Sequence, residues 1–172
     1  MKDLKTNPIA IGSNKILLIG IGNSGRGDDG LGWEFTDMLK RYDYNFLDYE
    51  YRYQLQIEDT VLISRYDTVI FADASHAALE NGFEVKGCEA ANHYFFSSHI
   101  QSPETILYLA NDLYNKHPEA FTVAISGNYW DLKTSLSKVA EKNLQSAFSF
   151  FVKDFLPTIQ PKTKVKKDQF TA

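Results

Sequence analysis

The stretch KILLIGIGNSGRGDDGLG, residues 15–32, decides the fold class of this chain. Residues 15–21 form an apolar segment between Asn14 and Gly22, which is typical of a central strand covered on both faces. From residue 31 onward the apolar side chains recur at helical spacing. The residues that share this face are Leu31, Phe35, Met38 and Leu39. The stretch therefore predicts a strand, a glycine-rich turn and a helix, which is the first unit of an α/β fold.

The same alternation continues along the chain. We expect further strands at 44–51, 68–73, 83–89 and 121–126, and helices at 57–65, from 102 onward and at 135–155. The helix from 102 onward has the clearest start, because Ser102 can cap it, Pro103 suits its first turn and Glu104 favours its positive end. These elements predict one three-layer α/β domain over residues 1–160, with a twisted, mostly parallel five-stranded sheet and helices on both faces.

Composition and charge narrow the class of protein. At 172 residues with 44% hydrophobic residues, the chain suits one globular domain with a packed core. Residues 161–172 hold four of the 18 basic residues and one of the 22 acidic residues, which leaves a formal charge of −7 on residues 1–160. An acidic body disfavours a nucleic-acid partner. We expect residues 161–172 to form a basic, flexible tail.

The start of the chain and its cysteine content predict a cytoplasmic protein. Residues 1–15 lack the apolar core of a signal peptide, and a single cysteine, Cys88, cannot form an internal disulfide. The sequence also lacks a run of about 18 apolar residues that would cross a membrane. We therefore expect no membrane association.

Residues 20–25 match the dinucleotide-binding pattern G-x-G-x-x-G, with Asp48 or Glu50 as a possible ribose partner. The two acids that follow, Asp28 and Asp29, argue against this interpretation. They would repel the pyrophosphate that the motif holds at a helix N-terminus. One of them, Asp28, is expected to cap the following helix.

The acids instead predict a metal site. In an open α/β sheet, ligands bind at the carboxyl ends of the strands, so an acid after the first strand and Asp73 at the end of the 68–73 strand can face one crevice. Two converging carboxylates favour a cation between them, and an added imidazole shifts the preference toward nickel, zinc or cobalt. Spacing favours His99 as that imidazole, just before the Ser102 cap, and leaves His76 and His93 as alternatives.

Two other residues invite a functional interpretation. His117 precedes a proline in a polar loop and is best explained as a surface residue. Cys88 lies near the histidines, which raises the possibility of a cysteine nucleophile. A small buried thiol in the 83–89 strand explains this residue better.

Four ordered segments resemble the hydrogenase maturation proteases, the endopeptidases that trim the C-terminus of the large subunit of nickel–iron hydrogenases. The first is GNSGRGDDGLG at 22–32, similar to the family pattern G-N-x-L-R-x-D-D-G-x-G. The others are TVIFADAS, SSHIQSPETILYLA and ISGNYWDLKTSLSKVAEK, and together the matches span residues 15–155.

This resemblance implies a cytoplasmic endopeptidase whose partner is a hydrogenase large-subunit precursor. It places the nickel contacts on Asp29, Asp73 and His99, which would be both the metal-binding and the catalytic residues. The nickel would be that of the precursor's assembled metal centre, so that the protease recognises a loaded precursor. No serine or cysteine nucleophile is implied.

The chain departs from the family pattern at two places. Gly25 replaces the usual leucine and thereby completes the dinucleotide match, and residues 51–55, YRYQL, replace a glycine–threonine pair beside the expected cleft. These differences indicate a divergent member with an unusual precursor. Two alternatives stay open, a non-catalytic metal-binding or chaperone-like module and a dinucleotide-dependent oxidoreductase.

Overall fold

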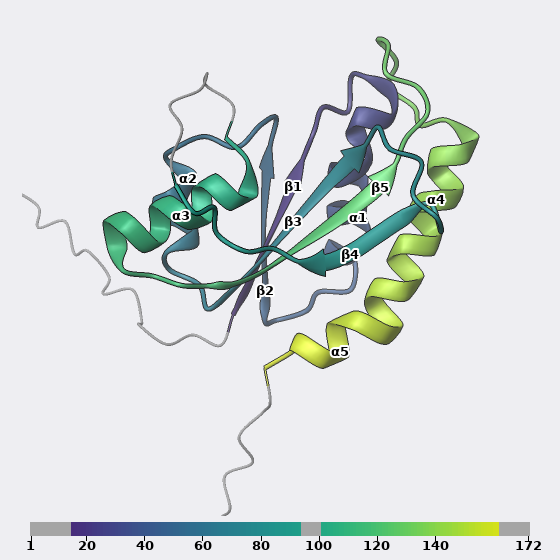
Figure 1. Ribbon diagram of the computed structural model, residues 1–172. Coiled ribbons are helices and arrows are strands. Elements are labelled where there is room, and N and C mark those ends of the chain that lie inside the picture. Colours follow the sequence, from purple (N-terminus) through teal and green to yellow (C-terminus); the bar gives the residue numbers. More distant parts are fainter. Residues whose placement is uncertain (1–14, 94–100, 162–172) are drawn as a thin grey trace, which may run out of the picture.

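The sheet of this protein has five strands in the order β2-β1-β3-β5-β4 (Figure 1). The structure is a computed structural model that describes residues 15–93 and 101–161. Neighbouring strands are parallel except β4, which runs antiparallel to β5 at the edge. The strands are β1 Ile16–Ile21, β2 Leu47–Arg52, β3 Thr68–Ser75, β4 Phe83–Gly87 and β5 Glu119–Ser126. The predicted mostly parallel five-stranded sheet is confirmed.

Helices cover both faces of this sheet, as Figure 1 shows. One face carries α2 and α3, and the other carries α1, α4 and α5. The helical elements are η1 Gly27–Gly30, α1 Leu31–Lys40, α2 Asp59–Ile63, α3 Pro103–Tyr114, α4 Lys138–Phe150, η2 Phe151–Phe155 and α5 Leu156–Ile159. Of these, η1 is a 3₁₀ turn and η2 a π-helical turn that continues α4 into α5.

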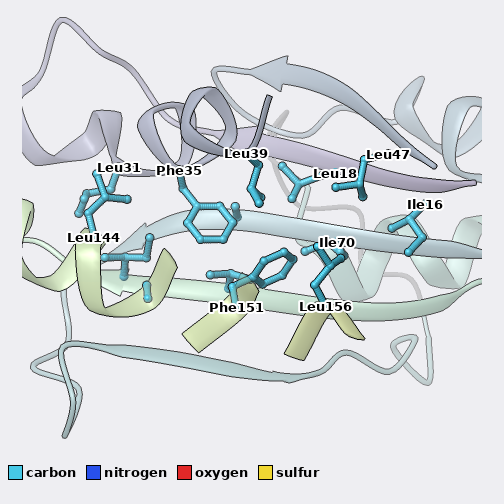
Figure 2. Close-up of a cluster of buried hydrophobic side chains, with 14 of the residues drawn as sticks. Ile16, Leu18, Leu31, Phe35, Leu39, Leu47, Ile70, Leu144, Phe151 and Leu156 are labelled. Atoms are coloured by element: carbon cyan, nitrogen blue, oxygen red, sulfur yellow. The ribbon is translucent and has the colours of Figure 1, made fainter. Parts of the chain in front are cut away.

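The two layers of helices enclose two separate cores because successive residues of a strand point to opposite faces. In β1, Ile16 and Leu18 pack into the core under α1 and α4, whereas Leu17 and Ile19 pack into the core under α2 and α3. Figure 2 shows the first core, with Phe35 of α1 beside Phe151 at a ring-centroid distance of 5.1 Å. Burial on both faces explains why the first strand reads as a continuous apolar run.

Several predicted element boundaries differ from the observed ones, and the largest shifts are in where the second strand and the helix predicted at 135–155 begin. The second strand begins at Leu47, because Tyr44 stacks on Tyr42 and Phe46 packs on Tyr44 at the turn after α1. The helix predicted at 135–155 begins at Lys138, after its N-cap Ser137. The other cap is as predicted, since the Thr105 N–H donates to Ser102 Oγ at 3.3 Å.

Part of the expected architecture lies outside the described residues. This applies to the basic tail from residue 162 on and to the segment that contains His99. Within the described residues, no helix has the length and apolar character needed to span a bilayer.

Candidate functional site

The strand order places a topological switch point beside β1, at the carboxyl ends of the parallel strands. β1 lies between β2 and β3 in the sheet. The chain therefore moves from β1 to one side for β2 and then crosses to the other side of β1 for β3. In open α/β sheets this switch point, at the carboxyl ends of the strands, is where ligands bind. The turn after β1 carries Asp29, and the last residues of β3 include Asp73.

Gly22 allows the chain to fold back sharply after β1. Its φ of +136° is a conformation that side chains rarely adopt, and a Cβ at this position would lie 1.9 Å from the backbone oxygen of Asp29. The same oxygen accepts a hydrogen bond from the Asn23 N–H at 3.0 Å. The glycine therefore brings η1, and Asp29 with it, against the end of β1.

Asp73 is a half-buried carboxyl group with a strongly altered acidity. Burial is the main cause that raises the pKa of Asp73 to about 7; the negative charge of Asp29 acts in the same direction, and a hydrogen bond from the Ala74 N–H opposes the shift. The influence of Asp29 on this pKa means that the two side chains share one electrostatic environment. The structure thus brings together two of the three predicted site residues.

The structure does not describe the third predicted residue, His99. Of the two alternatives, His76 is exposed and stacks on Trp130 with ring centroids 3.6 Å apart, and His93 is also exposed. Among residues 15–93 and 101–161, no three histidine, cysteine or acidic side chains form a group that could hold a metal ion. Within this part of the chain, the candidate site therefore consists of Asp29 and Asp73.

The prediction that Asp28 caps α1 is wrong. Neither η1 nor α1 has a side-chain cap, and the Asp28 carboxylate, which is 0% exposed, accepts four hydrogen bonds from the connection between β5 and α4. The donors are the N–H groups of Asn128, Tyr129 and Ser137 and the Ser137 hydroxyl, at 2.7–2.9 Å. Asp28 faces this connection because η1 packs directly against it.

The electrostatics of Asp28 agree with a structural role. Burial favours a higher pKa, but the hydrogen bonds from Ser137, Asn128 and Tyr129 outweigh it and lower the pKa of this carboxyl group. Asp28 is therefore an ionised anchor whose acceptor sites are already used. Sequence reasoning missed this role because its partners lie about 100 positions away, at 128, 129 and 137.

The bulky residues at the end of β2 lie beside the turn after β1. The backbone oxygen of Arg52 accepts from the Gly22 N–H at 2.9 Å and from Trp33 Nε1 at 3.0 Å. Tyr53, which is 68% exposed, packs on Trp33 with ring centroids 5.2 Å apart. The aromatic side chains of Trp33 and Tyr53 therefore lie beside the turn that carries Asp29.

Cys88 lacks the properties of a nucleophile. It follows β4, is half-buried and packs against the core under α2 and α3. Burial, together with the charge of Glu104, raises the pKa of Cys88 to about 11. The thiolate, which is the nucleophilic form, is therefore scarce at neutral pH.

The glycine-rich turn also lacks the geometry of a dinucleotide site. In that motif the helix begins within the glycine pattern and points its free N–H groups at the pyrophosphate. Here η1 separates Gly25 from α1, which begins at Leu31, and the first turn of η1 carries Asp28 and Asp29. This places negative charge where a pyrophosphate would have to bind.

Comparison with solved structures identifies the fold. The chain is similar to the hydrogenase maturating endopeptidase HybD from E. coli, with 16% identity over 78% of this chain and 88% of that one and a TM-score of 0.63. The hydrogenase maturation protease HycI from Thermococcus kodakarensis KOD1 has 18% identity, covers 84% and 94%, and has a TM-score of 0.63. The hydrogenase 2 maturation peptidase from Thaumarchaeota archaeon SCGC_AB-539-E09 has 18% identity, covers 80% and 95%, and has a TM-score of 0.59.

These structural neighbours are hydrogenase maturation endopeptidases at low sequence identity. No family model and no curated protein matches the chain. The chain therefore shares the fold of these endopeptidases at 16–18% sequence identity.

Proposed function

We propose that this protein is a cytoplasmic endopeptidase that removes the C-terminal peptide of a nickel-loaded hydrogenase large-subunit precursor. One observation carries the proposal: Asp29 and Asp73 lie together at the sheet's switch point, in the fold of the maturation endopeptidases. The resemblance of the sequence around residues 22–32 to the family pattern supports the same function.

The two carboxylates suit contact with a metal centre. The charge of Asp29 disfavours ionisation of Asp73, and a cation between the two side chains would replace the proton that Asp73 retains near neutral pH. The predicted third contact, His99, would add an imidazole, which together with the carboxylates suits nickel. In this proposal the nickel belongs to the precursor, and Asp29, Asp73 and His99 recognise it.

Hydrolysis adds one water molecule across the scissile amide and leaves a new carboxylate on the subunit and a new amine on the released peptide. The metal supplies Lewis acidity, either toward the amide carbonyl or toward the attacking water. The role of the protein's own side chains is to hold the precursor's metal centre and the adjacent amide at the sheet edge. Fixed positioning of this kind contributes much of the rate enhancement in enzymes.

The decisive experiment incubates purified protein with nickel-loaded precursor from the organism that makes this chain and follows the precursor's size. We expect shortening of the loaded precursor and none of the metal-free precursor. Asp29→Asn and His99→Ala should abolish cleavage, whereas Asp43→Asn, an exposed acid beyond the far end of α1, should not. Normal cleavage by the first two variants would show that the site assignment is wrong.

The same experiment separates the alternatives. A non-catalytic module would bind the precursor stably without shortening it. A dinucleotide-dependent enzyme would bind a nicotinamide or flavin cofactor saturably, and the replacement of Asp29 and Asp73 would leave that binding unchanged.

A further inference from the structure

A polar cleft of about 550 Å³ lies at the same edge of the sheet as the candidate site. Its walls are the β3–β4 connection, the end of β5 and one side of α4. Ser126 of this cleft pairs in register with Ser75, two positions beyond Asp73 on the parallel strand β3. The volume lies in the range of roughly 300–1,000 Å³ that is typical of ligand-binding pockets.

The frame of the cleft is held by buried hydrogen bonds. Ser126, which is 6% exposed, donates from Oγ to the Ala77 oxygen at 2.8 Å and accepts from the Leu79 N–H at 3.0 Å. Asn143 of α4 donates from Nδ2 to the Ser126 oxygen at 2.8 Å. Gly82 has a φ of +77°, and a Cβ there would lie 2.1 Å from Asn143 Oδ1. The cleft is therefore preformed.

The cleft is in physical contact with the turn that carries Asp29. Gly127 lines the cleft, and a Cβ at this position would lie 2.7 Å from the Asp28 Cβ and 2.8 Å from the Trp130 ring. Trp130 in turn stacks on His76, another lining residue. A chain bound across the candidate site can thus continue into the cleft without leaving the edge of the sheet.

The lining offers polar groups that the protein itself does not use. Within the described part of the chain, the side chains of Asn81, Asn128, Lys142 and Ser146 all line the cleft, and none takes part in a hydrogen bond or ion pair. Amide and hydroxyl groups of this kind can pair with a peptide backbone, and the Lys142 ammonium can pair with a carboxylate. A folded domain cannot enter this volume, whereas an extended chain end can.

We propose that this cleft binds the C-terminal peptide that the enzyme removes, in an extended conformation, with Lys142 paired to a carboxylate of that peptide. The inference rests on the proposed endopeptidase function and deepens it. It assigns the recognition of the leaving segment to α4 and the β3–β4 connection, separately from the recognition of nickel by Asp29, Asp73 and His99.

The test fills the cleft with a large side chain. Ser146 and Gln145 are adjacent, exposed residues of α4, and only Ser146 lines the cleft. We expect Ser146→Trp to raise the KM for nickel-loaded precursor by about tenfold or more, with little change in kcat. Gln145→Trp should leave both constants unchanged. Melting temperatures of both variants equal to that of the wild type would show that neither substitution perturbs the fold.

A binding measurement separates this inference from the proposed function. The probe is a fluorescently labelled synthetic peptide with the sequence of the precursor's C-terminal extension, followed by anisotropy. Lys142→Ala should weaken its binding by about fivefold at low salt, an effect that salt screens, whereas Lys138→Ala, an exposed lysine outside the cleft, should not.

The outcomes differ for the two claims. Unchanged KM and unchanged peptide binding in Ser146→Trp would overturn the cleft assignment while precursor cleavage persists. Peptide binding by the wild type that Ser146→Trp abolishes, without any precursor cleavage by the wild type, would support the cleft and remove the endopeptidase function.

Discussion

The carboxylate of Asp28 accepts two hydrogen bonds from Ser137, one from its N–H and one from its hydroxyl, each at 2.7 Å. The two residues are 109 positions apart in the chain. Ser137 is also the N-cap of α4, since its hydroxyl accepts from the Ala140 N–H at 3.1 Å. The two hydrogen bonds between Asp28 and Ser137 therefore join the turn that holds Asp29 to the start of α4, which forms one wall of the cleft.

Replacement of Asp28 should destabilise the protein strongly. In Asp28→Asn the amide keeps only one acceptor oxygen and turns a donor toward the N–H groups that surround the carboxylate. We expect a loss of about 3 kcal/mol in the free energy of unfolding, measured by urea denaturation. A loss below about 0.5 kcal/mol would contradict the anchoring role.

Ser137→Ala provides a graded comparison with that variant. It removes one of the four bonds to Asp28 and the cap of α4 but leaves the carboxylate and its three N–H donors in place. We expect a loss of about 1–2 kcal/mol, smaller than that of Asp28→Asn. An equal or larger loss would mean that capping dominates over the Asp28 contacts.

The stability of the protein should depend on the ionisation of Asp73. Its pKa is raised from 3.8 to about 7 in the folded state. Between these values the unfolded chain has lost the proton and the folded chain still holds it, so rising pH favours unfolding. The protonated Asp73 carboxyl group thus stabilises the folded state relative to the ionised group. This stabilisation is fully present below about pH 4 and is lost by the time the pH passes about 7.

The measurement compares melting temperatures of wild type and Asp73→Asn from pH 4 to pH 8. We expect the variant to gain relative to wild type as the pH rises, because its amide cannot ionise. Asp43→Asn, an exposed acid for comparison, should show no such trend. A constant difference between wild type and Asp73→Asn across this range would show that the carboxyl group has an ordinary pKa.

A side chain at Gly22 should disrupt the candidate site. In Gly22→Ala the new Cβ meets the Asp29 backbone oxygen at 1.9 Å, and the φ of +136° adds strain. We expect a loss of about 2 kcal/mol or more in unfolding free energy, together with loss of precursor cleavage. Gly87→Ala has nothing within 4 Å of the new Cβ and should change stability by less than about 0.5 kcal/mol.

Cys88 should be dispensable for catalysis. Because its thiol is half-buried and its pKa lies at about 11, we expect Cys88→Ala to keep the kcat of precursor cleavage within about twofold and to cost about 1 kcal/mol of stability. Alkylation of the native protein by iodoacetamide at pH 7.5 should be slow. A loss of cleavage in a variant that stays folded would instead identify Cys88 as a nucleophile.

Local sequence predicted most of the fold. The apolar run in β1 and the alternation of short apolar segments with segments of helical spacing indicated an α/β sheet. Both signals can be read from neighbouring residues, because a strand buried on two faces is apolar throughout and a helix repeats its apolar residues with a period of about 3.6. The cap at Ser102 was equally local, since its partner Thr105 lies three positions away. The start of β2 at Leu47 was less predictable because aromatic packing before it decides where the strand begins. The start of α4 at Lys138 depends on its cap Ser137, which is held by the distant Asp28 carboxylate.

The candidate site was predicted in part. The sequence by itself determined that Asp29 and Asp73 follow two buried strands, which in a parallel sheet places both at one edge. Only the tertiary structure decided that Asp28 anchors the connection before α4 instead of capping α1, and that a polar cleft lies beside the site. Both depend on where the residues around positions 126–146 lie relative to the turn after β1, a relationship between distant segments that no local pattern encodes.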